Sequence, residues 1–442
     1  MPASREKIQQ QFVGKKIAIL GFGLEGRSTL EFLLDLGVES ADIEIRDARE
    51  IPEKLAVATR TGEKYLEDLE NFDWIFKAPG VSVFLPELAG VQEKLTSQAQ
   101  VFFDFYAGKV VTITGTKGKS TTSTLLAQVL EAAGLRVKLV GNIGKPVLSE
   151  IGFEDDFDWV VYETSSYVLE NLRKKNEIAL ILNIFPDHLD RHHGFENYKN
   201  AKLKNFLGAK EKFVNQEVVL KFPEIRDFAQ DFVTFGHGGD FHFHAGSFLK
   251  GVEKLFDFVP EAPSLQGQHN LLNLLAIVGV CEKIGIDWEI VEKTFQNFVG
   301  LPHRLQKVGL FRGVEFWDDA NSTTPESTVA ALRALGRQVE TIFLGGQDRG
   351  YDFADLVAVV QESGIKNVVL FPDTTQKLRV LLGENFNFLE TSSMEEAVEW
   401  AFAVTSVEKI CLLSTAAPSY SLRKNADEKG KLFVAAVEKF GQ

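Results

Sequence analysis

Residues 114–121 read Thr-Gly-Thr-Lys-Gly-Lys-Ser-Thr, a glycine-containing loop that leads directly into Lys119 and Ser120. Backbone N–H groups where a loop opens a helix face an anion, and a lysine there reaches terminal phosphates. The hydroxyl of Ser120 or Thr121 can hold Mg²⁺. Only two residues separate Gly115 from Gly118, fewer than in the standard phosphate loop. A chance match in a surface loop is the alternative, but the predicted strand before it and helix after it favour polyphosphate binding.

Carboxylate and imidazole groups follow two further predicted strands. Magnesium bound to ATP needs oxygen ligands beyond a loop hydroxyl, and parallel strands present such ligands at their carboxyl ends. Glu163 follows an apolar segment at 159–162, and the segment 183–191, which contains Asp187 and His188, follows one at 179–183. Each residue alone could be a helix cap or part of a surface ion pair. Their shared position beside a phosphate loop predicts a metal–nucleotide site.

A second glycine loop lies near the start of the chain. Gly21, Gly23 and Gly26 follow the apolar segment 15–20, and Asp47 comes about 20 residues later. This spacing alone suggests a dinucleotide site of the kind found in dehydrogenases. Nothing downstream supplies hydride chemistry, which disfavours a dehydrogenase.

These loops require alternating strands and helices to position them. Apolar segments separated by helix-length segments predict three α/β blocks, each with a mostly parallel sheet. Turn signals place the domain boundaries near Gly108 and Leu301, giving domains 1–108, 109–301 and 302–442. Residues 213–263 predict an antiparallel extension of the middle block, and 271–281 predict a buried helix. The remaining predicted strands are 43–45, 110–114, 314–318, 341–345, 367–371 and 409–413. One predicted helix follows the glycine loop 21–26 and runs through Leu36, and another spans 120–133.

The composition excludes several classes of protein. Of 442 residues, 62 are acidic and 48 basic, a net charge of −14, which argues against wrapping a nucleic-acid backbone. Cys281 and Cys411 are too few for a disulfide scaffold or a cysteine zinc site, and we expect both to be buried. No segment has the roughly 18 uninterrupted apolar residues of a membrane span. We therefore expect a cytoplasmic protein, monomeric, with neither a membrane nor a nucleic acid as partner.

Seven segments taken together resemble the Mur ligases of bacterial cell-wall synthesis, and within that family the members that add glutamate. The resemblance covers nearly the whole chain in the family's order. The segments are GTKGKSTT at 115–122, GNIGKP at 141–146, YETSSYVLE at 162–170, NIFPDHLDRH at 183–192, YKNAK at 198–202, GQHNLLN at 267–273 and PHR at 302–304.

The resemblance implies a fold and a reaction. The fold would comprise a Rossmann-like UDP-binding domain, a central P-loop ATPase domain and a Rossmann-like C-terminal domain. The reaction would join D-glutamate to UDP-N-acetylmuramoyl-L-alanine through an acyl phosphate, releasing ADP and phosphate. Three alternatives stay open: the same reaction with L-glutamate, a folylpolyglutamate-type ligase, and a nucleotide-binding relative without ligase activity. The extra N-terminal block disfavours the folate alternative.

The resemblance also implies roles for individual residues of the nucleotide site. The implied catalytic residues are Lys119, His188, Lys202 and Asn142. The implied ATP contacts are Gly115, Thr116, Lys117, Gly118, Lys119, Ser120, Thr121, Asn270, Arg304 and Asp319. Two Mg²⁺ ions would be served by Ser120, Glu163, His188 and Lys202. Lys202 aligns with a lysine that the family carries as a carbamate, although by itself it would read as a solvated helix lysine.

The two other substrates have implied sites as well. Glu25 is an awkward neighbour for a diphosphate, so we expect it to point outward. Asn321 and Arg423 replace a usual lysine and a usual aromatic residue of the glutamate site, which motivates the L-glutamate alternative. The implied UDP-substrate contacts are Gly23, Leu24, Glu25, Asp47, Arg49, Pro79, Gly80 and Asn142, and those for glutamate are Arg349, Ser414 and Arg423.

Overall fold

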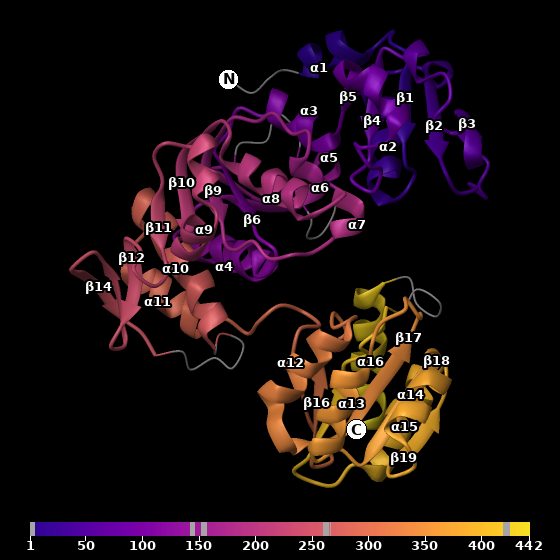
Figure 1. The fold of residues 1–442 in the computed structure, drawn as a ribbon, viewed down its shortest axis with the longest axis vertical. Coiled ribbons are helices and arrows are strands. Elements are labelled where there is room, and N and C mark those ends of the chain that lie inside the picture. The colour runs from indigo at the N-terminus through magenta and orange to yellow at the C-terminus, as the bar shows by residue number, and fades with distance from the viewer. Residues whose placement is uncertain (1–4, 142–145, 152–156, 260–264, 266, 419–424) are drawn as a thin grey trace. The chain divides into compact units, whose positions relative to one another are not determined.

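The computed structural model describes residues 5–141, 146–151, 157–259, 265, 267–418 and 425–442 (Figure 1). It contains three β-sheets, and the chain divides into two compact units, Met1–Phe298 and Val299–Gln442. The first unit holds two of the sheets and the second unit holds the third. The prediction of an α/β protein with three sheets is confirmed.

The N-terminal sheet has the strand order β3-β2-β1-β4-β5, and all of its strand pairs are parallel. The apolar segment at the start of β1 is fully buried in it, because parallel strands are covered on both faces. The elements are α1 (Arg5–Phe12), β1 (Ile17–Leu20), α2 (Leu24–Leu36), β2 (Ile43–Asp47), β3 (Ala58–Thr61), β4 (Trp74–Lys77), β5 (Leu95–Thr96) and α3 (Gln98–Phe105).

The central sheet has the strand order β14-β13-β12-β11-β10-β9-β6-β8-β7. Its first strands are β6 (Val110–Thr114), β7 (Val137–Gly141), β8 (Trp159–Glu163) and β9 (Asn176–Ile181). The strands that extend it are β10 (Ala209–Asn215), β11 (Val233–Phe235), β12 (Phe241–His244), β13 (Ser247–Lys250) and β14 (Glu253–Asp257). The predicted antiparallel extension is correct for β12–β14, whereas β10 and β11 pair in parallel. Strands β10 and β11 pair in parallel because a helical segment precedes each of them, and a helical crossover lets the next strand run in the same direction as the last.

The helices of this block cover both faces of the central sheet. Helix α4 packs against β7 and β8, and α10 packs against β10 and β12. The segment 271–281 forms part of α10 and is mostly buried, which confirms the predicted core helix. The helices are α4 (Lys119–Ala132), α5 (Val147–Glu150), α6 (Ser166–Leu169), α7 (Leu189–His192), α8 (Phe195–Leu203), α9 (Gln216–Lys221), α10 (Gln268–Ile284) and α11 (Trp288–Gln296).

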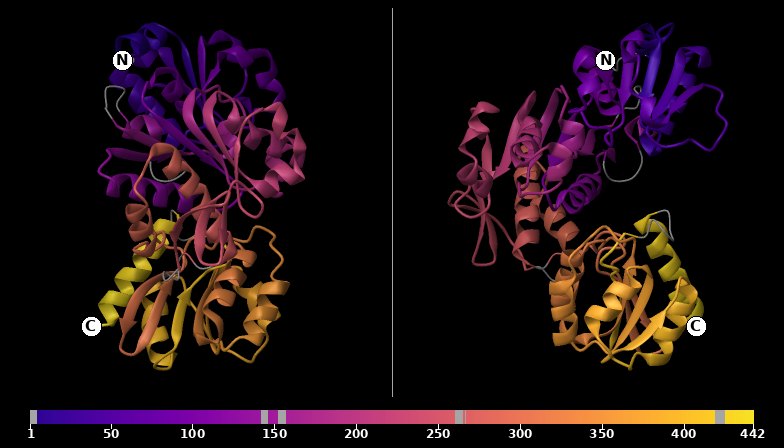
Figure 2. Two further views of the ribbon diagram at one scale, coloured as in Figure 1. Left: turned by 90° about the vertical axis from the view of Figure 1, so that its left-hand side faces the viewer. Right: turned by 45° about the vertical axis from the view of Figure 1, so that its right-hand side comes forward.

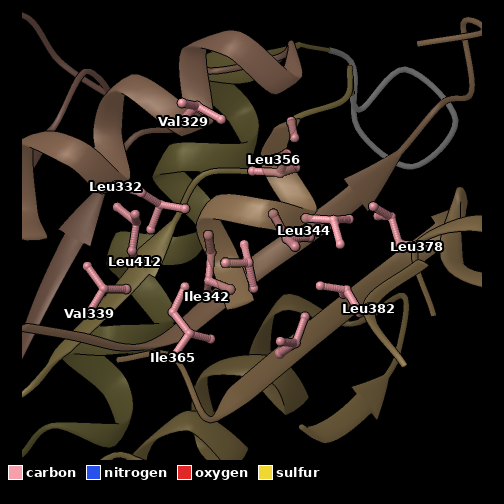
Figure 3. Packing of buried hydrophobic residues seen from close by; sticks show 14 of the residues in the cluster. Val329, Leu332, Val339, Ile342, Leu344, Leu356, Ile365, Leu378, Leu382 and Leu412 are labelled. Atoms are coloured by element: carbon pink, nitrogen blue, oxygen red, sulfur yellow. The ribbon is translucent and has the colours of Figure 1, made fainter. Parts of the chain in front are cut away.

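The C-terminal sheet has the order β15-β16-β20-β17-β18-β19, with only the β15–β16 pair antiparallel among the described strands. Helices α12, α13 and α14 cover one face and α15 and α16 cover the other (Figure 2). Figure 3 shows apolar side chains that pack on the first of these faces. The elements are β15 (Gln306–Phe311), β16 (Val314–Asp318), α12 (Pro325–Leu335), β17 (Val339–Gly346), α13 (Ala354–Glu362), β18 (Asn367–Asp373), α14 (Thr375–Leu382), β19 (Asn387–Glu390), α15 (Met394–Val404), β20 (Ile410–Leu413) and α16 (Ala426–Phe440).

Two predictions about the chain as a whole can be compared with the structure. Both cysteines are free thiols and are buried, as expected. Among the helices that the structure describes, none combines the length and apolar character needed to cross a membrane.

Candidate active site

The loop after β6 has the geometry of a phosphate-binding loop. Strand β6 lies between β8 and β9, so its carboxyl end opens at the middle of the parallel part of the sheet. Gly118 has a φ of 84°, which glycine adopts without strain, and α4 begins at the next residue. The side chain of Asn183 accepts a hydrogen bond from the Lys117 N–H at 2.9 Å and donates one to the Lys117 carbonyl at 3.0 Å. The loop is therefore held in shape by protein contacts alone.

Two lysines meet on the carbonyl oxygen of Gly115. Lys119 Nζ donates to it at 2.9 Å, and Lys202 Nζ, from α8, donates to it at 2.8 Å. Lys202 is only 1% exposed. Burial lowers the pKa of Lys202 well below its usual value and Lys119 lowers it further, while the carboxylates of Asp187 and Glu163 act in the opposite direction. The structure thus brings Lys202 to the phosphate loop, as the resemblance implied.

A carboxylate lies beside these two amines. Glu163 ends β8 in register with Ile113 of β6, and it is 1% exposed. Ser123 on α4 contributes a hydroxyl 3.5 Å from Glu163 Oε2. Within the described parts of the chain, no cluster of three or more His, Cys, Asp or Glu side chains is arranged to hold a metal ion. A metal here would have to take most of its ligands from phosphate and water, which is how Mg²⁺ binds nucleotides.

His188 stands at the rim of the same region. It has a left-handed backbone with φ 53° and precedes the short helix α7. Its side chain is half exposed, and the centroid of its imidazole ring lies 5.3 Å from that of the Tyr167 ring. Burial lowers the pKa of His188 below its usual value; Asp187 opposes this, and Lys202 and Lys119 reinforce it. The imidazole is therefore neutral near pH 7.

Tyr198, the first residue of the segment YKNAK, has a role in the site that the sequence patterns did not indicate. Its hydroxyl is 2.8 Å from Thr116 Oγ1, and its ring lies under the ammonium group of Lys202 at 4.9 Å. Thr116 Oγ1 also accepts a hydrogen bond from the Phe185 N–H at 3.0 Å. Tyr198 therefore joins α8 to the phosphate loop and positions Lys202. The spacing of four residues between Tyr198 and Lys202, one helical turn, was the available signal.

Asn270 lies on α10, close to the opposite side of the phosphate loop. It is buried, and Asn273 Nδ2 donates to its side-chain oxygen at 3.4 Å. Asn273 in turn lies against the loop: a methyl group built on Gly118 would come within 2.4 Å of Asn273 Oδ1. The two asparagines link α10 to the loop.

The glycine loop of the N-terminal sheet is braced by Asp47. The Phe22 N–H donates to Asp47 Oδ2 at 2.7 Å, and the Arg49 N–H donates to Oδ1 at 2.8 Å. Burial raises the pKa of Asp47, but these N–H groups outweigh it and the net pKa is lowered. A methyl group on Gly26 would lie 2.1 Å from the Gly21 carbonyl, so only glycine allows this approach of helix and loop.

The expectation that Glu25 points outward is wrong. Its side chain is half-buried at the start of α2. Burial raises the pKa of Glu25 to about 7, and the nearby charge of Lys77 acts to lower it. The reason is tertiary: Lys77 ends the neighbouring strand β4 and is itself buried. Gly23 and Leu24 are exposed at this loop, and Pro79 and Gly80 follow β4.

In the C-terminal unit, the predicted residues fall into two groups. Asp319 and Ser414 are buried and bonded to each other, with Ser414 Oγ 2.8 Å from Asp319 Oδ2. Burial raises the pKa of Asp319 to about 6. Arg304 and Arg349 are exposed, and Arg349 Nε donates to Gln347 at 3.3 Å. The predicted residues Asn142 and Arg423 lie outside the described residues.

A cavity of about 570 Å³ opens on the other side of the central sheet from the phosphate loop, at the amino ends of strands β8 and β9. Trp159 and Glu177 line it, and a Lys283–Glu211 ion pair of 2.8 Å lies at its wall. None of the predicted site residues lines this cavity. The groups that could do chemistry lie instead at the carboxyl ends of β6, β8 and β9, so we place the candidate active site there.

Comparison with known proteins identifies the family of the chain. Residues 113–281 match the family described as Mur ligase middle domain, and residues 15–97 match the family described as Mur ligase MurD-like, N-terminal domain. The chain is 31% identical to the UDP-N-acetylmuramoylalanine–D-glutamate ligase of Pseudomonas savastanoi, and the alignment covers 95% of this chain and 97% of that relative. It is 29% identical to the ligase of the same name from Acetivibrio thermocellus, and that alignment covers 97% of each chain. The crystal structure of UDP-N-acetylmuramate-alanine ligase MurC from Thermotoga maritima superposes with a TM-score of 0.60 at 18% identity, covering 96% of this chain and 99% of that one. Together with the phosphate-loop geometry, these matches show that the chain belongs to the Mur ligases, the ATP-dependent ligases of peptidoglycan precursors.

Proposed function

We propose that this Mur ligase joins D-glutamate to the terminal carboxylate of UDP-N-acetylmuramoyl-L-alanine, releasing ADP and phosphate. The observation that carries the proposal is the meeting of Lys119, Lys202 and Glu163 at the carboxyl end of the strands that bear the phosphate loop. The full-length similarity to ligases of that name, at about 30% identity, supports this choice of substrates.

A carboxylate offers no good leaving group, and this determines the order of the chemical steps. An amine does not displace an oxide from it, so the acid is first converted to an acyl phosphate with the γ-phosphoryl group of ATP. The amine of the amino acid then attacks, a tetrahedral intermediate forms, and phosphate departs with the C–O electron pair. Phosphoryl transfer depends on alignment and charge neutralisation. Lys119 supplies a positive charge at the loop, and neutral His188 can donate a hydrogen bond to the acyl oxygen.

A divalent metal fits this donor set. Glu163 and Ser120 offer hard oxygen ligands of the kind that Mg²⁺ prefers, and Glu163 is a buried carboxylate beside two amines. Ser120 and Glu163 would hold the ions, together with His188 and Lys202. The metal would neutralise charge on the phosphates when bound.

We also propose that Lys202 carries a carbamate in the active enzyme. Carbamate formation needs an unprotonated amine, and burial lowers the pKa of Lys202 well below its usual value. Addition of CO₂ to the unprotonated Nζ atom forms the N–C bond, releases one proton and gives an anion; counted from the ammonium form of Lys202, two protons are released. The carbamate oxygens would then face the metal side of the loop.

The other predicted roles enter the proposal as follows. The domains are 1–108, 109–301 and 302–442, and the first takes the UDP group with Gly23, Leu24, Asp47 and Arg49. Asp319 and Arg304 serve the nucleotide, and Arg349 and Arg423 serve the amino acid, because an Arg fork binds a carboxylate with two hydrogen bonds. The enzyme acts as a cytoplasmic monomer.

One observation favours L-glutamate as a second candidate. Asn321 occupies the position of a lysine in typical D-glutamate ligases, and here its side chain donates to the Pro302 carbonyl at 3.2 Å. That bond braces the turn that carries Arg304. An asparagine side chain is neutral, so Asn321 supplies no charge to the amino acid where a lysine would. The folate alternative is disfavoured because residues 15–97 match a MurD-like N-terminal domain.

The test is ADP release from the purified protein with ATP, Mg²⁺ and UDP-N-acetylmuramoyl-L-alanine, comparing D-glutamate, L-glutamate and a diamino acid. We expect release only when the acceptor and one glutamate isomer are both present, with the amide product identified by mass. Lys119→Met should abolish it. Lys210→Met is the matched control, since Lys210 is an exposed lysine of the same domain, paired with Glu177. ADP release that ignores the nucleotide sugar would overturn the proposal.

A further inference from the structure

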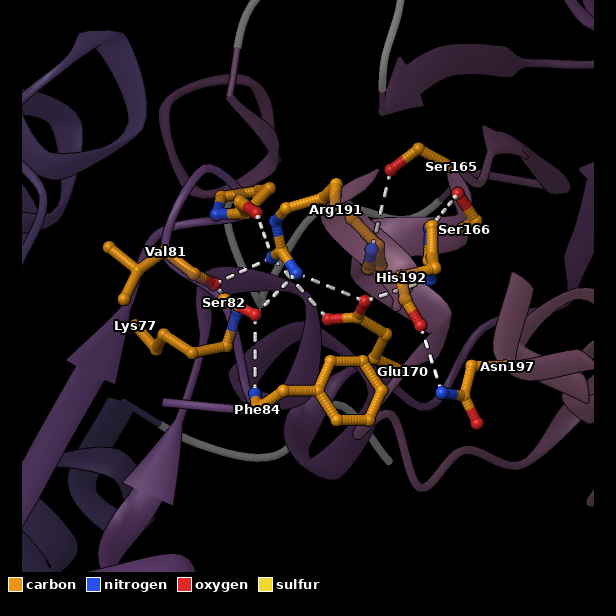
Figure 4. A network of polar contacts seen from close by, with 12 residues as sticks. Lys77, Val81, Ser82, Phe84, Ser165, Ser166, Glu170, Arg191, His192 and Asn197 are labelled. Carbon is orange, nitrogen blue, oxygen red and sulfur yellow. Dashed lines mark hydrogen bonds and ion pairs between the residues drawn. The ribbon is translucent and has the colours of Figure 1, made fainter. Parts of the chain in front are cut away.

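A second polar cluster, separate from the phosphate loop, joins the N-terminal sheet to the central one (Figure 4). Its centre is the guanidinium group of Arg191 in α7. Nη2 donates to the backbone carbonyls of Val81 at 2.7 Å and Pro79 at 3.0 Å, and Nη1 lies 3.0 Å from Ser82 Oγ. All three partners belong to the loop after β4, which we call loop 78–82.

The same guanidinium is held from the other side by Glu170, at the end of α6. The two charged groups meet through two contacts of 3.3 and 3.5 Å. Glu170 is 4% exposed, and its backbone carbonyl accepts a hydrogen bond from Lys204 at 2.6 Å. His192 Nδ1 lies 3.1 Å from Glu170 Oε1. Arginine is suited to this place because its planar guanidinium group carries more N–H donors, in a fixed fork, than the ammonium group of a lysine.

Loop 78–82 is held by a second buried cation from within its own sheet. Lys77 Nζ donates to the Val81 carbonyl at 3.0 Å and to the Ala78 carbonyl at 3.3 Å. The Val81 carbonyl therefore accepts from both Lys77 and Arg191. The loop is fixed through the backbone oxygens of Ala78, Pro79 and Val81 and through the Ser82 side-chain oxygen.

The position of Arg191 gives this cluster a consequence for catalysis. Arg191 lies three residues after His188, in a four-residue helix bounded on both sides by left-handed residues, His188 and His193, each with a φ of 53°. Loop 78–82 contains Pro79 and Gly80 of the proposed UDP-substrate site. One guanidinium thus ties the segment that carries His188 to the segment that lines the nucleotide-sugar pocket.

We propose that Arg191 is a positioning residue that sets the distance between the bound nucleotide sugar and the ATP site, by locking loop 78–82 to the His188 segment. The proposal rests on the proposed function for the identity of the sugar substrate. A side chain that aligns two substrates affects the rate of the joining step, because small displacements of reacting groups cost large factors in rate.

The test compares Arg191→Ala, Arg191→Lys and Glu170→Gln with the control Arg173→Ala. Arg173 is an exposed arginine of the same domain whose hydrogen bonds to Gln100 use backbone atoms. We expect Arg191→Ala to lower kcat by about tenfold or more while the Kd for ADP changes less than about twofold. Arg191→Lys should fall between Arg191→Ala and the wild type. Glu170→Gln combined with Arg191→Ala should add little to the loss from Arg191→Ala alone.

Amide hydrogen exchange gives a readout that needs no acceptor substrate. In Arg191→Ala, exchange should quicken in both residues 80–84 and residues 187–193, and stay unchanged in Arg173→Ala. If exchange rises in only one of the two segments, or if kcat per folded molecule equals that of the wild type, Arg191 is merely structural and the proposal is wrong. A wild-type enzyme that ignores the UDP substrate would refute the proposed function, whereas the exchange result would still decide the role of Arg191.

Discussion

Replacing Gly118 by alanine tests whether the phosphate loop is connected to α10. Gly118 and Gly134 lie at the two ends of α4, with φ values of 84° and 81°. A methyl group at Gly134 meets nothing within 4 Å, whereas one at Gly118 would come within 2.4 Å of Asn273 Oδ1. The two substitutions therefore share the backbone strain and differ in the collision.

The expected magnitudes follow from that difference. A left-handed alanine costs about 1–2 kcal/mol, so Gly134→Ala should lower the free energy of unfolding by that amount. At Gly118, displacing Asn273 also breaks its hydrogen bond to Asn270, and the loss of one buried hydrogen bond costs about 0.5–1.5 kcal/mol more. For a domain of this size each kcal/mol corresponds to a shift of about 2–4 °C in Tm. Because Asn270 is one of the ATP contacts that the family resemblance implies, Gly118→Ala should also weaken ADP binding by about tenfold or more, which is about 1.4 kcal/mol.

Thermal unfolding and calorimetric titration with ADP and Mg²⁺ measure the two effects. Gly134→Ala should leave the Kd for ADP unchanged. In an Asn273→Ala background, where the obstructing atoms are absent, Gly118→Ala should cost only the backbone strain. Equal losses of Tm for the two glycine variants, with equal Kd values, would refute the reasoning, because Asn273 would then move aside without cost.

Four other outcomes are expected. Wild-type turnover should fall in CO₂-free buffer and recover with bicarbonate at constant pH, and Lys202→Arg should be inactive with or without it; a rate indifferent to bicarbonate contradicts the carbamate. Glu163→Gln, which keeps the shape but loses the charge, should raise the Mg²⁺ concentration needed for half-maximal ADP release, and an unchanged titration curve would speak against a metal at this carboxylate. Phe248→Ala should lower the free energy of unfolding by about 3–5 kcal/mol without changing the Kd for ADP, because Phe248 is fully buried among other rings far from the loop in sequence; a smaller loss, seen by thermal unfolding, would show that the site collapses around the cavity. The hydrogen bond to Asp318 raises the pKa of His303, so its stabilising effect is fully present below about pH 6.5 and is lost as pH rises through the folded-state pKa. Amide protection in residues 299–442, measured as exchange relative to the intrinsic base-catalysed rate, should fall over that range in the wild type, and the same fall in His303→Gln would exclude this pair as its cause.

Local sequence patterns were sufficient for the strands that bear the two glycine loops, but not for β3, β4, β5, β15 and β19, which those patterns did not predict. The segment 110–114 is a run of β-branched residues and is a fully buried strand in the structure. Gly118 was recognisable as a loop residue because glycine followed by Lys-Ser-Thr signals a helix start. The position of Glu163 at a strand end also followed from the sequence, since a short apolar run ends there. Each of these inferences depends only on residues close together in the chain.

Contacts between distant residues were decided by the tertiary structure. Lys202 reaches the Gly115 carbonyl from 87 positions away, and Arg191 reaches Pro79 from 112 positions away. Glu25 was misjudged because its half-burial depends on how the start of α2 packs in the fold, near enough to the buried Lys77 of β4 for that charge to act on its pKa. Ser414 was predicted to contact glutamate, yet its hydroxyl is buried against Asp319. The sequence by itself determined the elements and the chemistry that their ends carry, because propensity and periodicity are local; which of those ends face one another depends on strand order and packing, and these are properties of the whole fold.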